Sequence, residues 1–254
     1  MIKPRIVLLV NILSIPKIAR KRKPHKQPMK KILLLSLCTL LTATYTFAQK
    51  DAAAKAILAQ VSAKYKMYDV VKTDFTFTLE NKQAGVTDTQ YGTLIAKSKA
   101  NKFKVSIYGT AAGGQASVAQ EIISDGKTQW TYLKKDNEVQ VANVDNSGEG
   151  LNPAQIFTIY EHGYKYIYNG EVKVGGKTYQ EIDLTPEDIK KSFFKVRLHI
   201  DKAKKQIYSA LIFDNNGNRY TYTLRTFTPN VPAPDNTFSF DTKAHKGVEV
   251  VDLR

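Results

Sequence analysis

The amino-acid sequence predicts a mainly β fold with two helices, built around one large antiparallel sheet. Three observations lead to this prediction. Segments of alternating apolar and polar residues recur along most of the chain, short polar turns separate them, and only two stretches have apolar residues at helical spacing. Alternation gives each strand one apolar face, and short turns favour antiparallel neighbours because parallel strands need long crossovers.

Residues 29–48 have the composition of a cleavable signal peptide and are excluded from the fold prediction. Lys30 and Lys31 provide a basic start, residues 32–41 form an apolar run, and small residues lead up to Ala48. The run is shorter than the roughly 20 residues that cross a bilayer. We therefore expect export and cleavage after Ala48.

The signal peptide divides the chain into three expected parts. Residues 1–28 precede it and are predicted to be disordered, as a non-native or extended N-terminal start, because they are rich in charge and proline. Residues 49–254 follow it and are long enough for one large domain. Cys38, the only cysteine, lies inside the apolar run. Lipidation of Cys38 is the alternative to cleavage after Ala48, and it would leave the protein anchored to a membrane.

The charge balance argues against a nucleic-acid-binding protein. The chain has 38 Lys and Arg against 23 Asp and Glu, but ten of the basic residues and no acidic residue lie in residues 1–48. The expected domain therefore has 28 basic and 23 acidic residues, a net charge of +5. The basic surface that a nucleic-acid partner requires is mostly in the discarded segment.

The predicted elements begin with an amphipathic helix at residues 51–69, where apolar residues recur every three or four positions. The period changes to two at residues 72–82, in which Phe75 and Phe77 alternate with polar residues. A second, short helix is expected at residues 152–163, because a proline occupies its first position and a glycine ends it. Further strands are expected at residues 91–98, 101–108, 129–135, 138–144, 164–174, 177–184, 193–201, 205–214, 219–227, 236–241 and 247–253.

No motif in the sequence indicates catalysis or a metal site. His162, His199 and His245 lie at a helix end, on the polar face of a strand and in a late loop, without the spacing of metal ligands. The chain has no nucleophile elbow and no phosphate-binding glycine loop. The sequence therefore disfavours an enzyme and predicts no cofactor and no metal.

Three segments carry a resemblance to a known family. Residues 121–141, EIISDGKTQWTYLKKDNEVQV, resemble the central hairpin of LolA, the periplasmic lipoprotein carrier. Residues 237–254, TFSFDTKAHKGVEVVDLR, resemble that family's end, and NKFKV at residues 101–105 is similar to one of its strands. The three segments occur in the family's order, after a helix and a strand that also match.

The resemblance implies an incomplete antiparallel β-barrel of about 11 strands, with helices as a lid over an apolar cavity. It also implies a monomeric periplasmic carrier that shields the acyl chains of lipoproteins and shuttles them from the inner to the outer membrane. The implied partners are an acylated lipoprotein, an inner-membrane ABC-type lipoprotein exporter, and the outer membrane or an acceptor there. Such a carrier needs a cavity and no catalytic residues, since an exposed methylene costs about 0.8 kcal/mol in water.

The cavity and its lid can be assigned to particular side chains under this resemblance. The predicted cavity wall consists of Phe75, Phe77, Phe103, Val105, Trp130 and Tyr132, and the predicted lid of Ile156, Phe157 and Tyr160. Lys99 is the predicted latch, although it stands where the family has an arginine and lacks that residue's planar fork of donors. Phe103→Glu is expected to leave the chain folded but unable to bind lipoprotein.

Two alternatives to a lipoprotein shuttle remain. The first is an outer-membrane-anchored acceptor of the same fold, lipidated at Cys38. The second is a periplasmic lipid-binding or sensor module with a filled core and no transport role, because alternation alone does not decide whether a sheet encloses a void or a packed interior.

Overall fold

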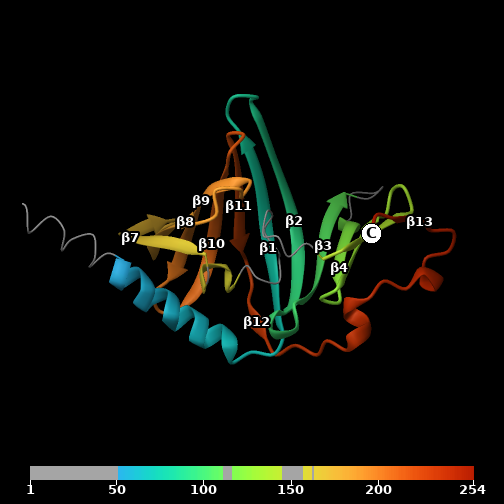
Figure 1. Cartoon of the computed structure of the whole chain (residues 1–254), viewed down its shortest axis with the longest axis horizontal. Coiled ribbons are helices and arrows are strands. Elements are labelled where there is room, and N and C mark those ends of the chain that lie inside the picture. The colour runs from blue at the N-terminus through green and yellow to red at the C-terminus, as the bar shows by residue number, and fades with distance from the viewer. Residues whose placement is uncertain (1–50, 111–115, 145–156, 162) are drawn as a thin grey trace, which may run out of the picture. The chain divides into compact units, whose positions relative to one another are not determined.

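The computed structural model describes residues 51–110, 116–144, 157–161 and 163–254. All of these residues belong to one compact unit. This unit is mainly β, as predicted, with one α-helix (residues 51–66) among the residues described (Figure 1). Within the same ranges, no helix combines the length and the apolar composition that a bilayer crossing requires.

The described residues contain thirteen strands, which form one sheet. The strands are β1 (Val71–Asn81), β2 (Val86–Lys97), β3 (Lys102–Thr110), β4 (Ala116–Ser124), β5 (Thr128–Leu133), β6 (Glu138–Asn143), β7 (Tyr164–Val174), β8 (Lys177–Pro186), β9 (Phe193–Asp201), β10 (Gln206–Asp214), β11 (Asn218–Leu224), β12 (Thr228–Pro229) and β13 (Glu249–Asp252). Their order is β13-β6-β5-β4-β3-β2-β1-β11-β10-β9-β8-β7, and β12 pairs with β1 beside this path. All pairs are antiparallel except β13 with β6, which is parallel.

This topology corrects the predicted barrel. Among the described residues the sheet is mixed, has 13 strands and is not closed, because its end strands β7 and β13 pair there only with β8 and β6. Period-two alternation identified the strands, but it carries no information on strand direction or on closure.

The second predicted helix is only partly described. Residues 152–156 and 162 lie outside the described residues, and within 157–161 the chain forms a 3-10 turn, η3 (Ile159–Glu161). The predicted strand at residues 236–241 is wrong, since the chain there forms a 3-10 turn, η4 (Asp235–Phe238). Pro234 precedes that turn, where its missing N–H group has no cost because the first N–H groups of a helical turn have no partner within the turn.

The register defines two faces of the sheet, because residues paired across an antiparallel ladder point to the same side. Val71 pairs with Ala96, Ala96 with Phe103, and Phe103 with Ser124. We call the side that carries Phe103 the helix face, since its buried residues form one cluster with buried residues of the helix. The other side is called the opposite face.

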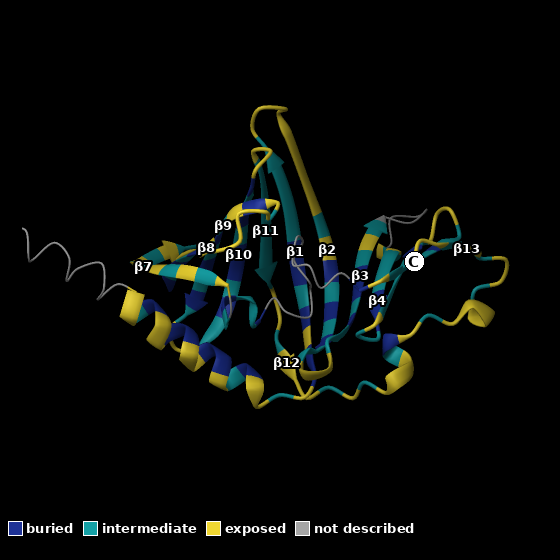
Figure 2. Cartoon of the chain, viewed as in Figure 1, coloured by how far each residue is buried: buried dark blue, intermediate teal, exposed yellow. Residues whose placement is uncertain are grey.

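The helix belongs to this fold because its buried residues form one stripe. Ala54, Leu58, Val61 and Tyr65 recur at three- and four-residue intervals and are buried, whereas the residues between them are mostly exposed (Figure 2). The stripe packs against residues of the helix face, among them Ile182, Leu184, Leu198, Ile200, Ala210 and Ile212. Burying each large aliphatic side chain stabilises the fold by about 1.5–3 kcal/mol.

Candidate functional site

Four of the six predicted cavity residues lie on the helix face. Phe75, Phe103 and Val105 are buried members of the cluster that includes the helix. Phe77 is half-buried against this cluster, with its ring centroid 5.0 Å from that of Tyr222. These four side chains therefore share one apolar surface, but three of them are packed within the core in this structure.

The aromatic packing on this surface depends on one glycine. A Cβ atom at Gly92 would lie 2.5 Å from the ring of Phe75 and 2.8 Å from the carbonyl oxygen of Ser106. Gly92 is the cross-strand partner of Phe75, so its missing side chain leaves the space in which the Phe75 ring lies over β2.

The other two predicted cavity residues, Trp130 and Tyr132, lie on the opposite face. Trp130 pairs with Ile123, and Tyr132 pairs with Glu121, so neither shares the face of Phe103. The Tyr132 ring instead contacts Phe240 and His245 of the C-terminal segment, with centroid distances of 5.2 and 4.7 Å. The six residues therefore do not form one wall, because adjacent even-numbered and odd-numbered positions on a strand point to opposite sides.

Two of the predicted lid residues lie beneath the helix. Phe157 and Tyr160 are buried, and the Phe157 ring centroid is 4.6 Å from that of Tyr65. Ile156 lies outside the described residues. Lys99 is exposed in the turn η1 (Ser98–Ala100) between β2 and β3, and its role as a latch stays a prediction.

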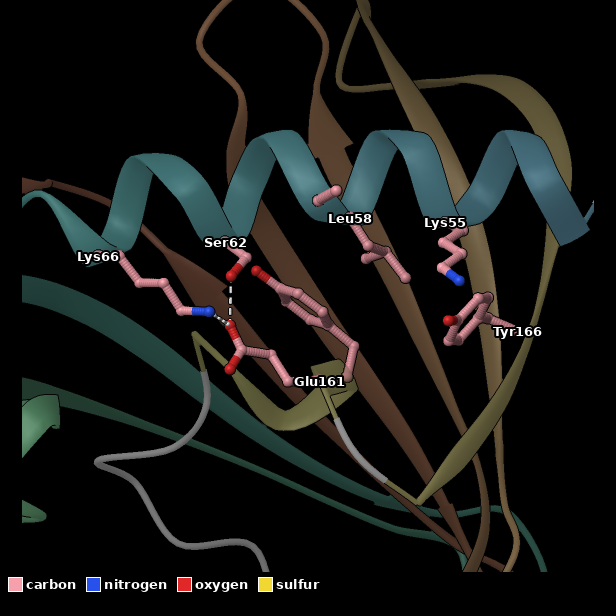
Figure 3. Close-up of a pocket in the computed structure, with 8 residues that line it drawn as sticks. Lys55, Leu58, Ser62, Lys66, Glu161 and Tyr166 are labelled. Carbon is pink, nitrogen blue, oxygen red and sulfur yellow. Dashed lines mark hydrogen bonds and ion pairs between the residues drawn. The ribbon is translucent and has the colours of Figure 1, made fainter.

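A pocket of about 290 Å³ lies between the helix, η3 and β7 (Figure 3). Figure 3 shows Lys55, Ser62 and Lys66 extending from the helix, with Ser62 and Lys66 reaching Glu161 and Lys55 lying near Tyr166. The complete lining is Lys55, Leu58, Ala59, Ser62, Lys66, Tyr160, Glu161 and Tyr166.

Most of these pocket residues were not predicted from the sequence. Lys55, Ala59, Ser62 and Lys66 are spaced by four, three and four positions, which places them in one row along the helix. The spacing of these four residues could therefore have predicted that they line one surface of the helix. Glu161 lies 99 positions from Ser62, and no local pattern connects the two residues.

Polar contacts hold the helix over the sheet. The Ser62 hydroxyl donates a hydrogen bond to Glu161 Oε1, and Lys66 Nζ lies 2.9 Å from the same oxygen. The Lys64 ammonium donates to the carbonyl oxygen of Lys204. Tyr65 accepts a hydrogen bond of 3.3 Å from the backbone N–H of Ile207, and burial raises the pKa of this phenol despite that hydrogen bond.

Tyr160 is the unusual group of the pocket. Its side chain is buried, and its hydroxyl has no hydrogen-bond partner among the residues that the structure describes. An unpaired buried hydroxyl costs about 1–3 kcal/mol. Burial, followed by the proximity of Tyr65 and Glu161, raises the pKa of Tyr160, so the phenol stays protonated and can donate a hydrogen bond.

The opposite face of β8 and β9 carries an ionic ladder rather than a pocket. Arg197 donates from Nε and Nη2 to Asp183 over 2.7 and 2.8 Å. His199 lies 2.9 Å from the Ser209 hydroxyl and 3.2 Å from Glu181, so the predicted position of His199 on a polar strand face is confirmed. In the described part of the chain, no group of three or more His, Cys, Asp or Glu side chains is placed to hold a metal ion.

Burial alone would raise the pKa of the Asp183 carboxyl. Hydrogen bonds from Arg197 and Asn169 and the positive charges of Arg197 and Lys195 outweigh that effect and hold this pKa below its ordinary value. The hydrogen bond to Asp183, together with the charges of Asp183 and Glu181, raises the pKa of Arg197 against the lowering effect of burial. The ladder therefore stabilises the sheet through charged hydrogen bonds between neighbouring strands.

Several solved structures are similar to this chain at low sequence identity. An uncharacterised conserved protein from Thermus thermophilus is 14% identical with a TM-score of 0.48, and the match covers 79% of this chain and 99% of that one. A LolA superfamily protein from Nitrosomonas europaea is 14% identical with a TM-score of 0.42, covering 74% and 98%. The lipoprotein LppX from Mycobacterium tuberculosis is 15% identical with a TM-score of 0.43, covering 72% and 98%.

A comparison with curated protein sequences gave no significant match. The family model described as outer membrane lipoprotein carrier protein LolA matches residues 66–241, well over half of the chain. This match includes the ladder from β1 to β11 and both η3 and η4. The chain belongs to the LolA family.

Proposed function

We propose that this protein is a periplasmic carrier that shields the acyl chains of lipoproteins and transfers them from the inner to the outer membrane. The name of the family supports this cargo. The supporting structural observation is an apolar sheet face covered by an amphipathic helix whose outer side is polar. A carrier of this kind needs no catalytic residue, because it only has to keep acyl chains out of water.

Cargo binding on this surface requires the helix to move. The pocket beneath the helix has about 290 Å³, which is at the lower limit of the roughly 300–1,000 Å³ of pockets for drug-sized ligands. Several acyl chains therefore need the apolar face that Phe75, Phe103 and Leu198 now share with the helix. In our proposal the helix and the segment around Phe157 form the lid, and acyl chains replace the helix stripe on the sheet.

The free energy needed to move the helix off the sheet is compatible with its replacement by acyl chains. Each methylene of an acyl chain that leaves water contributes about 0.8 kcal/mol, so a single chain of ordinary length offsets the burial of several helix side chains. The tethers of the helix are side-chain contacts from Ser62, Lys64 and Lys66, which break without disrupting the backbone ladder of the sheet.

Binding of an acylated lipoprotein tests the cargo. The exported protein is mixed with a purified lipoprotein and with the same protein lacking its acyl chains, and complex formation is measured by native mass spectrometry. We expect a complex only with the acylated form. Equal binding of both forms, or no bound lipid under any condition, would leave a binding or sensor module without transport as the better function. The intact mass of the exported protein separates a cleaved carrier from an acceptor lipidated at Cys38.

A cross-link tests the movement of the helix. Ser62→Cys with Glu161→Cys, joined by a short thiol-reactive linker, should fix the helix to η3 and reduce acylated-lipoprotein binding at least tenfold. Thr78→Cys with Thr89→Cys is the matched control, because it joins paired residues of β1 and β2 on the opposite face. If the locked helix binds cargo as well as the control does, acyl chains do not enter beneath it.

A further inference from the structure

The pocket beneath the helix has a positive charge that its own residues leave unbalanced. Lys55 and Lys66 contribute two ammonium groups, and Glu161 contributes one carboxylate. That carboxylate is already occupied by Lys66, at 2.9 Å, and by the Ser62 hydroxyl. Lys55 forms no ion pair with the residues that the structure describes, so the pocket retains a net charge of about +1.

The pocket also contains an unused hydrogen-bond donor. The Tyr160 side chain is 4% exposed, and its hydroxyl finds no acceptor within the described ranges. Its burial keeps it in the protonated form, which donates. A buried donor without an acceptor is uncommon in folded proteins, and an oxygen of a ligand in the pocket would provide the missing acceptor.

Most of the remaining lining is apolar, apart from the Tyr166 hydroxyl. Leu58, Ala59 and the rings of Tyr160 and Tyr166 line a volume of about 290 Å³. An uncompensated ammonium group, a free donor and apolar walls together fit a ligand that has anionic oxygens at one end and an alkyl chain at the other. Several acyl chains would be too large for it.

We propose that this pocket binds the anionic head, a phosphate or a carboxylate, of a single-chain amphiphile. Lys55 pairs with the negative charge, Tyr160 donates a hydrogen bond to one of its oxygens, and the first methylenes lie against Leu58 and Ala59. The site differs from the proposed acyl-chain surface, since the pocket has its own charge and donor, and it does not depend on lipoprotein carriage. Ligands without a charged head, including the acyl chains themselves, gain nothing from Lys55.

Calorimetric titration of the purified protein tests the charge and the chain separately. The probes are decyl phosphate, decanoate, decanol and inorganic phosphate, each below its aggregation concentration. We expect the two anionic amphiphiles to bind at least tenfold more tightly than decanol and than inorganic phosphate. Equal binding of decanol overturns the role of the charge, and equal binding of inorganic phosphate makes this a site for the free ion.

Two variants assign the binding to this pocket. Lys55→Met and Tyr160→Phe should each weaken decyl phosphate binding at least fivefold, whereas Lys82→Met in the β1–β2 turn, which removes the same charge elsewhere, should not. Tyr160→Phe removes an unpaired hydroxyl, so its melting temperature without ligand should equal or exceed that of the parent protein. A folded Tyr160→Phe variant with unchanged affinity for decyl phosphate overturns the proposal, and so does unchanged affinity of Lys55→Met.

The cargo experiment remains independent of this test. If acylated lipoprotein binds but decyl phosphate does not, the carrier function stands and the anion site fails. If decyl phosphate binds in the pocket and lipoprotein does not, the anion site stands and the carrier function fails.

Discussion

The two ends of the sheet bury opposite faces. From β7 to β11 the helix covers the helix face, where Ile182 and Leu198 have no exposed surface. At β5 and β6 the buried side chains are instead Tyr132, Val139 and Val141 of the opposite face. The C-terminal segment packs there, with Phe240 and His245 against Tyr132. One sheet therefore has two covers, and only the helix is held mainly by side-chain contacts.

This difference suggests that the helix and the C-terminal segment have different roles, one as a movable cover and one as a fixed cover. The C-terminal cover continues into β13, whose backbone joins the ladder of β6, so its removal would break strand pairing. The helix has no backbone pairing with the sheet and contributes only side-chain packing and tethers. We expect the helix to open and the C-terminal segment to stay in place.

The largest expected effect is that of Phe103→Glu on the helix face. Phe103 is 1% exposed, so a carboxylate there would be buried without a partner. We expect a loss of more than about 5 kcal/mol in the free energy of unfolding, enough to unfold a domain of ordinary stability. This corrects the expectation that the variant stays folded. Circular dichroism in urea measures it, and a loss below about 2 kcal/mol would show that Phe103 is accessible.

A pair of aromatic truncations tests the separation of the two faces. Phe75→Ala and Tyr132→Ala should each lower the free energy of unfolding by about 3–5 kcal/mol, because each removes a buried ring. Only Phe75→Ala should also weaken binding of acylated lipoprotein, whereas Tyr132→Ala should accelerate proteolysis of the C-terminal segment. Urea titrations, binding assays and limited digestion are made on both proteins. Equal losses of cargo binding would mean that the acyl chains are not confined to the helix face.

The ionic ladder on the opposite face of β8 and β9 gives a pH-dependent prediction. Arg197→Met should cost about 1–3 kcal/mol at pH 7, since it leaves the Asp183 carboxylate without its main donor. The pKa of Asp183 is lowered in the folded state, so the pair contributes stability above the ordinary carboxyl pKa of about 3.9 and loses it as the pH falls further.

Arg197→Met should therefore lower the free energy of unfolding by its full amount at pH 7 and at pH 5, and by a smaller amount below about pH 4. Urea titrations at pH 7, 5 and 3 provide the comparison, with Asp183→Asn/Arg197→Met as the control that lacks both charges. A cost that is the same at all three pH values would show that the lost packing of the arginine, rather than its charge, is responsible.

The smallest expected effect is on the tether of the helix. Glu161→Gln weakens the contacts to Ser62 and Lys66, and because the Lys66 side chain is 61% exposed the loss should be about 0.2–1 kcal/mol. Hydrogen exchange of residues 51–66 should accelerate, while the strands remain protected. Glu171→Gln, which weakens the exposed pair with Lys202, is the matched control. Slower exchange in Glu161→Gln would mean that this contact does not hold the helix closed.

The elements of the fold were largely predictable because their signals are local. The spacing of Ala54, Leu58 and Val61 identified the helix, and alternation identified most of the strands. The face to which each strand turns was not predictable, since Trp130 and Phe103 look equally suited to an apolar wall until the register of β3, β4 and β5 is known. The same applies to the parallel pairing of β13 with β6, which joins segments more than 100 positions apart.

The candidate site shows the same limit. Phe157 and Tyr160 were predicted as residues of the lid, and in the structure they are packed beneath the helix. Lys55 and Lys66 share a row with Ser62 that the sequence displays, but nothing local indicates that Glu161 meets them. Charged contacts between distant segments depend on the whole topology, so the polar half of the pocket became visible only in the folded chain.

The fit between Gly92 and the Phe75 ring restricts which residues position 92 can carry. A side chain at position 92 would meet both the Phe75 ring and the backbone carbonyl oxygen of Ser106, so a smaller residue at position 75 relieves only the first of the two clashes. Homologues should therefore keep glycine at position 92 even where position 75 carries a smaller residue, and a variant library should reject alanine or serine at position 92 both singly and together with Phe75→Ala.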